Sequence, residues 1–368
     1  MNNNLKYWLA LHRAPGVGTS TFHTLLQQIK DPKILFENKE LLNTIPKLRA
    51  PLKEYLLTPN WDNVEKDLRW AEAEENHILT YHCSQYPSLL RETDSAPPLL
   101  FAKGNTELLK MPQLAMVGSR NPSSGGKENA FNFAKSLAQS GMTITSGMAL
   151  GIDAASHQGA LSVNGFTIAV AGTGADRIYP AKHQALAHQI IDNNGLIISE
   201  FVTGTPPIRA NFPLRNRIIS GLSLGVLVVE AATKSGSLIT ARMAGEQGRE
   251  IFAMPGSIHN PLAKGCHALI KQGAKLVETT EDILEELGQI ASVAISSSKE
   301  REHPDILTEQ LDNEYTEVLE NLGFEPTAIN SVVERSGLAA EDVSSMLLVL
   351  ELQGYVESHS GGHYSRIK

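Results

Sequence analysis

The fold of this chain is decided at residues 114–120, which read LAMVGSR. Four apolar residues are typical of a buried strand, and the Gly118-Ser119-Arg120 turn after them is small and rich in hydrogen-bond donors. Similar turns follow apolar runs at Ser146–Asp153 and Ser235–Thr240. In a parallel sheet such turns open on the same edge, so their backbone N–H groups converge on one crevice that suits phosphate.

Apolar runs alternate with amphipathic stretches from residue 113 to residue 288. The apolar runs are 114–117, 143–145, 167–171, 196–198, 225–230, 250–253 and 275–277. Continuous apolar strands indicate burial on both faces of a sheet, and their alternation with helices predicts a doubly wound, mostly parallel α/β fold. We therefore expect an extended Rossmann-like domain at 76–290, with two short strands, 78–81 and 99–101, before the alternating part.

The sequence before this domain is helical in pattern. Apolar residues recur at helical spacing around Trp8 and again between Phe22 and Ile29. The intervening Pro15-Gly16-Val17-Gly18 has two interpretations. It is either the turn of a helix-hairpin-helix, whose N–H groups can meet a DNA phosphate, or a plain turn between packed helices. Residues 1–75 are expected to form a small helical domain of the SAM or helix-hairpin-helix type.

The C-terminal part predicts a separate small domain. Residues 291–304 are polar and rich in serine, which predicts a flexible linker. Residues 305–368 show three helical patterns and then a hairpin pattern, which is the order of a winged helix. The helical patterns are 314–322, 328–335 and 340–353.

Charge and cysteine content limit the function classes. The 368 residues carry a net charge of −8, yet residues 300–368 alone hold 14 acidic and 4 basic residues. Residues 112–290 are nearly neutral, so a polyanion site must be local and must lie in the middle of the chain. Cys83 and Cys266 have no CxxC spacing, no apolar run is long enough for a membrane span, and no signal-peptide core begins the chain. We expect a cytoplasmic protein without a membrane span or disulfide.

A fourth segment, Phe212–Ser220, contributes Arg215, Asn216 and Arg217. Planar guanidinium forks suit phosphate. Two positions that lie two residues apart on a helix cannot face the same way. One arginine is therefore expected to face the crevice, and the other a carboxylate or a partner.

Other candidates allow both a structural and a functional interpretation. Asp153 either caps a helix or orients a ligand, whereas His157 is expected to be a packed core histidine. Ser237 and Thr240 add hydroxyls at a helix start beside Ser235, and capping needs only one hydroxyl. Lys182 either reaches the crevice or is a solvated surface lysine.

Several motifs are absent from the sequence. It has no GxGxxG with an acidic residue about 20 positions on, which disfavours an NAD site. It also has no HExxH or GxxxxGK[ST]. We predict no catalytic residue, no metal and no cofactor.

Taken together, the ordered motifs resemble the DprA/Smf family of DNA-processing proteins over nearly the whole chain. The motifs are Val117–Arg120, Ser146-Gly147 with Gly151-Ile152-Asp153, Gly172-Thr173-Gly174 with Tyr179-Pro180, Asn211–Gly221, Ser235–Ala241, Gly248-Arg249 and Pro255-Gly256.

The resemblance implies a single-stranded DNA-binding protein that is not an enzyme. It implies protection of incoming DNA in natural transformation, loading of the RecA recombinase, and a homodimer formed through the Rossmann-like domain. By position, Arg120 is the main expected DNA contact, and Lys182 lies one residue beyond the place of a lysine found in some relatives. The expected DNA-binding residues are Gly118, Ser119, Arg120, Ser146, Gly147, Lys182, Arg215, Asn216, Arg217, Ser237 and Thr240.

A second hypothesis is a nucleotide-binding hydrolase of the related lysine-decarboxylase-like Rossmann superfamily. Those enzymes carry a glutamate three residues after a threonine on the corresponding turn. If Thr240 takes the place of that threonine, Met243 takes the place of the glutamate. Methionine cannot act as an acid or a base, which favours a binding pocket over a hydrolase.

Overall fold

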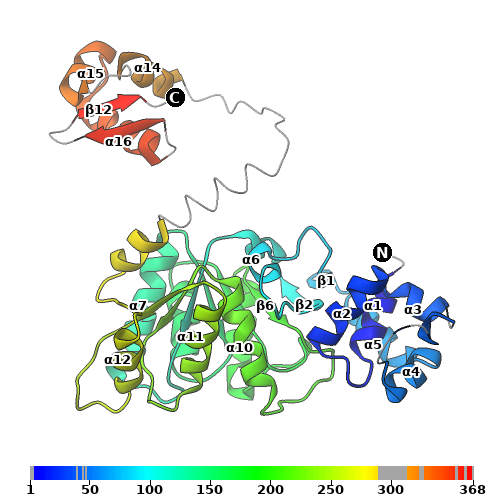
Figure 1. Cartoon of the computed structure of the whole chain (residues 1–368). Coiled ribbons are helices and arrows are strands. Elements are labelled where there is room, and N and C mark those ends of the chain that lie inside the picture. The colour runs from blue at the N-terminus through cyan, green and yellow to red at the C-terminus, as the bar shows by residue number, and fades with distance from the viewer. Residues whose placement is uncertain are drawn as a thin grey trace. The chain divides into compact units, whose positions relative to one another are not determined.

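The computed structural model of this chain describes residues 4–38, 40–43, 45, 48–288, 313–322, 327–352, 355–359 and 363–366. The chain divides into two compact units, residues 1–297 and residues 298–368 (Figure 1). The linker predicted at 291–304 lies outside the described residues. Each unit is described by itself.

A nine-stranded sheet forms the centre of the first unit, with its strands in the order β1-β2-β6-β5-β4-β3-β7-β8-β9. The strands are β1 (Asn76–Thr80), β2 (Leu99–Gly104), β3 (Gln113–Val117), β4 (Thr143–Gly147), β5 (Thr167–Val170), β6 (Leu196–Ser199), β7 (Gly225–Val228), β8 (Glu250–Ala253) and β9 (Lys275–Leu276). The strands from β6 across to β9 pair in parallel. β1 and β2 form an antiparallel hairpin that extends the sheet beside β6. The predicted doubly wound, mostly parallel sheet is confirmed.

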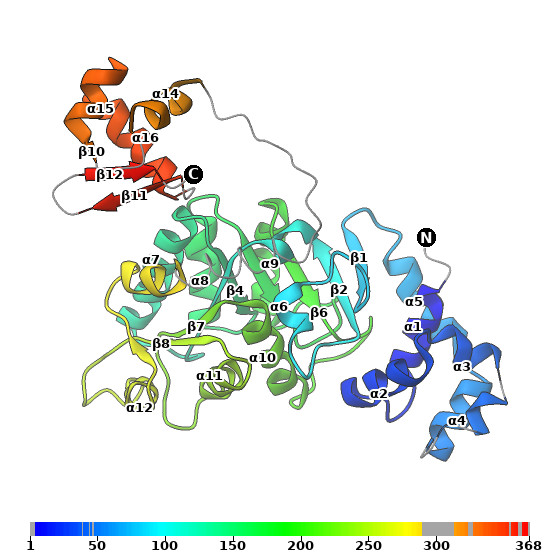
Figure 2. The ribbon, with the colours of Figure 1, turned by 45° about the horizontal axis from the view of Figure 1, so that its top comes forward.

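Helices cover both faces of this sheet (Figure 2). One face packs against α7 (Ser124–Gln139), α8 (Ile152–Leu161) and α9 (Gln184–Asp192). The other packs against α6 (Ser88–Arg91), α10 (Asn211–Leu222), α11 (Gly236–Glu246) and α12 (Lys264–Lys271). Burial on both faces explains why the strands are apolar along their whole length.

The strand order reverses at β3. From β3 the chain passes to β4, β5 and β6 on one side of the sheet, and β7, β8 and β9 follow on the other side. Ligands of open α/β sheets bind outside the carboxyl ends of the strands at such a switch point. The fold therefore places a crevice beyond the ends of β3 and β7.

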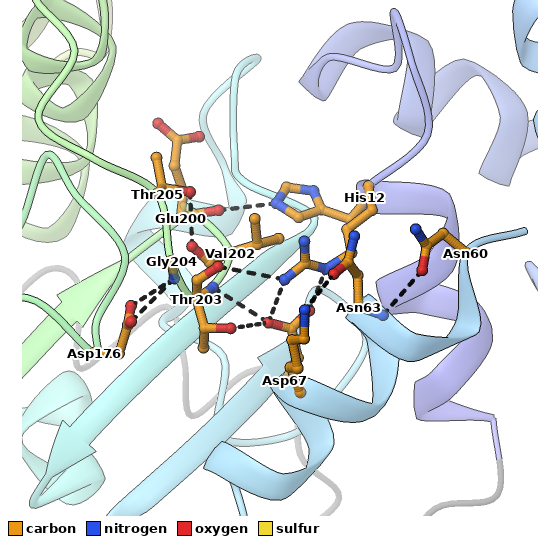
Figure 3. Close-up of polar contacts among 12 residues, drawn as sticks. His12, Asn60, Asn63, Asp67, Asp176, Glu200, Val202, Thr203, Gly204 and Thr205 are labelled. Atoms are coloured by element: carbon orange, nitrogen blue, oxygen red, sulfur yellow. Dashed lines mark hydrogen bonds and ion pairs between the residues drawn. The ribbon is translucent and has the colours of Figure 1, made fainter.

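The N-terminal helices pack against one edge of the sheet. They are α1 (Leu5–His12), α2 (Thr19–Ile29), α3 (Lys33–Glu37), α4 (Ala50–Leu57) and α5 (Trp61–Trp70). Leu99 and Phe101 of β2 belong to the same buried apolar cluster as these helices. Polar contacts add to this packing, because Asp67 accepts hydrogen bonds from Thr203, and His12 bonds the backbone oxygen of Glu200 at 2.9 Å (Figure 3). The helical region is thereby fixed to the sheet.

The second unit has the order of elements expected of a winged helix. Its elements are α14 (Asn313–Leu322), β10 (Thr327–Ala328), α15 (Ile329–Ser336), α16 (Ala340–Leu352), β11 (Val356–His359) and β12 (His363–Arg366). The strands form a small antiparallel sheet in the order β10-β12-β11. In neither unit does a helix of the described residues combine the length and the apolarity needed to cross a bilayer.

Candidate functional site

A crevice of about 600 Å³ opens at the switch point of the strand order, beyond the ends of β3 and β7. The turns after β3, β4 and β7 all reach it, together with the first half of α10, so the turns converge as the sequence predicts. The predicted site residues that line it are Gly118, Arg120, Arg215, Asn216, Ser237 and Thr240.

Three arginines line the crevice. Arg120 and Arg209 are exposed at its mouth, and Arg215 is buried in its floor. Within the described part of the chain, none of the three has a carboxylate oxygen within 4.0 Å of its guanidinium nitrogens. The crevice thus presents positive charge that no ion pair of the described residues neutralises.

Arg215 is held in place by the turns around it. Its Nη1 donates to the backbone oxygen of Val170, and its Nε donates to Oδ1 of Asn216 at 3.1 Å. Burial lowers the pKa of Arg215, and the nearby Asp153 charge opposes that shift. A Cβ at Gly147 would collide with Nη1 of Arg215 and Oδ2 of Asp153. Gly147 therefore serves the crevice by leaving room for the side chains of its floor.

Asp153 is the carboxylate that lines this crevice among the residues described. It does not cap α8, because the N-cap position is Gly151, which has φ 81°, and Oδ2 of Asp153 accepts from the N–H of Ala149 at 3.2 Å. Burial raises the pKa of Asp153, and Arg215 opposes the shift. Asp153 therefore organises the turn after β4 and faces the floor arginine.

Aromatic rings extend the crevice on the side of Arg120. The Arg120 guanidinium lies 5.7 Å from the centroid of the Phe212 ring, and the Phe212 and Tyr179 centroids are 5.7 Å apart. Tyr179 is 46% exposed. The predicted set of site residues missed Phe212, Tyr179 and Arg209. Their positions in the sequence could have indicated them. Tyr179 follows β5, and Arg209 and Phe212 lie beside the Arg215 segment that was already assigned to the crevice.

Some predicted contacts do not line the crevice. Oγ of Ser119 accepts from the N–H of Asn121, and Oγ of the buried Ser146 donates to the backbone oxygen of Met116 at 2.6 Å. These hydroxyls fix the turns and lie outside the lining of the crevice. Lys182 is exposed in the turn Ala181–His183 and is likewise outside the lining.

Arg217 faces away from the crevice. Its guanidinium donates to both carboxylate oxygens of Glu200, at 2.8 and 2.5 Å, and to Oγ1 of Thr19 at 3.2 Å. The helical spacing explains this, since Arg215 and Arg217 project from different sides of α10. Arg217 therefore joins α10 to the N-terminal helices, and it lies outside the lining of the crevice.

The hydroxyls at the start of α11 have separate roles. Ser235 caps the helix by accepting from the N–H of Ser237 at 3.3 Å, and the two Oγ atoms lie 2.6 Å apart. Thr240 is buried and lines the crevice. His157 is a core histidine as expected, bonded to Thr167 Oγ1 at 2.6 Å and to the Gly147 backbone oxygen at 2.8 Å.

The fold and the crevice define a Rossmann-like anion-binding protein with a winged-helix unit. Residues 77–288 match the family described as DNA recombination-mediator protein A, and residues 302–362 match the DprA winged helix domain. The chain belongs to this DprA/Smf family of DNA-processing proteins. Protein Smf of Escherichia coli (strain K12) is 44% identical over 301 residues, which are 82% of this chain and 80% of that protein.

Solved structures agree with this assignment. The X-ray structure of DNA processing protein A from Streptococcus pneumoniae has a TM-score of 0.67 and 36% identity, and the match covers 78% of this chain and 98% of that one. A structure of DNA processing protein A from Helicobacter pylori, described for its single-stranded DNA binding mode, has a TM-score of 0.51 and 30% identity. That match covers 57% of this chain and 99% of the Helicobacter chain.

Proposed function

We propose that this protein binds single-stranded DNA in the crevice outside β3 and β7. The observation that carries the proposal is a group of three arginines, without carboxylate partners among the described residues, beside the half-buried Phe212 ring and the exposed Tyr179 ring. Single-strand binding combines a positive groove for the backbone with aromatic rings on which bases stack. The similarity to the Helicobacter protein, described for its single-stranded DNA binding mode, supports the same ligand class.

The residues divide into contacts and supports. Arg120, Arg209 and Arg215 provide charge for phosphates, and Phe212 and Tyr179 provide faces for bases. The backbone at Gly118 and at Ser235–Thr240, with the Thr240 hydroxyl and the Asn216 amide, completes the lining. Ser119, Ser146, Gly147 and Arg217 are supports, and Lys182 stays a candidate contact for a longer strand.

The protein acts by binding and not by catalysis. The lining contains a single carboxylate, Asp153, which already accepts an N–H. Met243 stands where the related hydrolases carry glutamate, and it lies outside the lining. The raised pKa of Asp153 is the one observation that favours the hydrolase alternative, since perturbed carboxyl groups occur in active sites.

Family membership supports a wider role for the binding. We include protection of incoming DNA during transformation, loading of RecA, a homodimer through the Rossmann-like domain and a cytoplasmic location in the proposal. The proposal also divides the chain into functional domains 1–75, 76–290 and 305–368, with the linker 291–304 between the last two. No metal or cofactor takes part.

The proposal is tested by titrating labelled single-stranded and duplex oligonucleotides with the protein at two salt concentrations and measuring the affinity for each. Wild type should prefer the single strand, and its log affinity should fall with log salt at about −0.7 per phosphate neutralised. Arg120→Ala should lose roughly tenfold in affinity, in line with one charged hydrogen bond.

Lys135→Ala is the matched control. It removes one positive charge from the second half of α7, which runs away from the crevice edge, and should change the affinity by less than about twofold. Equal affinity for wild type and Arg120→Ala would reject the site. Release of free base from nucleoside monophosphates would favour the hydrolase instead.

A further inference from the structure

A second cavity lies beside the crevice, on the side of the N-terminal helices. It has a volume of about 310 Å³, within the usual range of ligand pockets. Tyr179 lines both the crevice and this cavity. Met148 lines this cavity and a smaller hollow that shares Arg120, Phe212 and Arg215 with the crevice. The cavity and the crevice are therefore neighbours with Tyr179 in common.

The lining of the cavity has the chemistry of a nucleotide site. Trp70 and Tyr179 supply aromatic surface, and Ala171 and Ile197 supply buried apolar floor. Lys103 and Arg177 supply positive charge. Lys103 has no carboxylate partner among the described residues, and Arg177 has only a loose, exposed pair with Asp176 at 3.7 Å. Such an exposed pair contributes little, so both cations are available to a ligand.

A buried acceptor in this lining lacks a donor. Oδ1 of Asn76 is inaccessible to solvent and has no hydrogen-bond partner within the described chain. The same amide donates through Nδ2 to the backbone oxygen of Trp70 at 2.7 Å, so its orientation is fixed. Because this oxygen is closed to solvent, Asn76 contributes to the wall of the cavity and not to the donors and acceptors that a ligand reaches.

The walls of the cavity are preformed. Asn76 lies opposite Lys103 in the β1–β2 hairpin, and Trp70 packs on Phe101 of β2 with ring centroids 5.8 Å apart. Trp70 ends α5, which Arg13 and Asp67 fix by two hydrogen bonds of 2.6 and 2.7 Å (Figure 3). A ligand therefore meets side chains that need little reordering.

We propose that this cavity is a second nucleotide pocket. The base contacts the aromatic and apolar lining, and the phosphate faces Lys103 and Arg177. Because Tyr179 lines both spaces, the next nucleotide of the bound strand is the expected occupant, an assignment that rests on the proposed function. A free nucleotide has the same chemistry, and the experiment below separates the two sources.

The test uses the full-length protein and oligothymidylates that lengthen by one nucleotide at a time. With wild type, affinity should gain a further step at the length that reaches the cavity. Lys103→Ala should abolish this step, so that long strands bind roughly tenfold more weakly while short strands bind as before. The salt slope for long strands should become shallower by about 0.7. Lys271→Ala, an exposed lysine at the end of α12, is the control and should keep the step.

Thymidine monophosphate, titrated by calorimetry, forms the second arm. Binding to wild type that Lys103→Ala abolishes, with an unchanged oligonucleotide series, identifies a free nucleotide as the occupant. One outcome is that Lys103→Ala changes neither the oligothymidylate series nor the binding of the monophosphate, while Arg120→Ala still weakens DNA binding. That result rejects the second pocket, and the proposed function stands. If wild type binds no oligonucleotide but binds the monophosphate through Lys103, the proposed function fails and the pocket stands. Equal weakening at every length also rejects the pocket, because Lys103 then acts only through long-range charge.

Discussion

The arginines of the crevice and those of the helical junction differ in what neutralises them. At the junction, Arg217 donates two hydrogen bonds to Glu200, and Arg13 donates two to Asp67. Both acids are buried. In the crevice, Arg120 and Arg209 have no carboxylate partner among the residues described. Arginine therefore joins two parts of the chain at the junction, and in the crevice it is available to bind an external anion.

The difference teaches how to separate support from contact in a positively charged fold. A buried, fully bonded guanidinium stabilises the folded state, and removing its partner leaves an uncompensated charge. An exposed guanidinium without a carboxylate adds little to stability and is free to hold phosphate. Variants at the two places should accordingly affect different measurements.

The largest effect is expected at the junction. Glu200→Gln removes the charge that Arg217 faces and should lower the free energy of unfolding by about 3–5 kcal/mol, while DNA affinity of the folded protein stays within about twofold. Urea unfolding followed by tryptophan fluorescence measures this, since Trp8, Trp61 and Trp70 all lie in the N-terminal helices. Glu107→Gln breaks the exposed pair with Lys110 and should leave the free energy of unfolding close to that of wild type. Similar losses in the two variants would contradict the comparison.

A somewhat smaller effect is expected from the histidine behind the crevice. Burial lowers the pKa of His157 from 6.5 to about 4. The unfolded chain then binds more protons than the folded chain between these pH values, so the stabilisation is present above pH 6.5 and is lost as pH falls to 4. The loss is about 3 kcal/mol, and half-buried His12, whose pKa is also lowered, adds to it in the same direction.

Urea unfolding across this pH range tests the histidine. The pH dependence of the free energy of unfolding should become shallower in His157→Gln, whatever the variant's stability at neutral pH. The exposed His188→Gln should keep the wild-type slope. An unchanged slope in His157→Gln would show that His157 is not the group that titrates.

The central fold could be predicted because its physics is local. Strands buried on both faces are apolar without interruption, and turns of small residues mark where they end, as at Val117–Arg120. The attachment of β1 and β2 to β6 could not be predicted, because the sequence of a strand does not show which distant strand it pairs with. Two-residue β10 was missed for the same reason.

The position of the site could be predicted from the sequence, but the side chains that line it could be predicted only in part. Turn position brings Gly118, Arg120 and Thr240 to one edge, which follows from topology alone. Side-chain direction does not follow, and so Ser146 was assigned to the crevice although its hydroxyl bonds the Met116 backbone. The partner of Arg217 is Glu200 on the preceding crossover, which only the folded structure reveals.

Arg209 sharpens the comparison on the crevice side. Because it is exposed and unpaired among the described residues, Arg209→Ala should leave the free energy of unfolding within about 0.5 kcal/mol and weaken single-strand binding roughly tenfold. The salt slope should become shallower by about 0.7. Fluorescence anisotropy at two salt concentrations gives both quantities, with Lys135→Ala as the control. A change in stability without a change in affinity would place Arg209 with the junction arginines.

The smallest effect is expected at Asp153, which is the exception to the comparison because it puts a carboxylate into the crevice. Asp153→Asn keeps an oxygen for the N–H of Ala149 and removes the negative charge, so DNA affinity should rise about two- to fivefold at low salt. Because burial raises the pKa of Asp153, its protonation begins at a higher pH than for an exposed aspartate. Wild-type affinity should therefore increase as pH falls toward that pKa, and the affinity of Asp153→Asn should respond less over the same range. Weaker binding by Asp153→Asn at every pH would instead show that the Asp153 charge is needed to position Arg215, which would make this carboxylate a support in the same sense as Glu200.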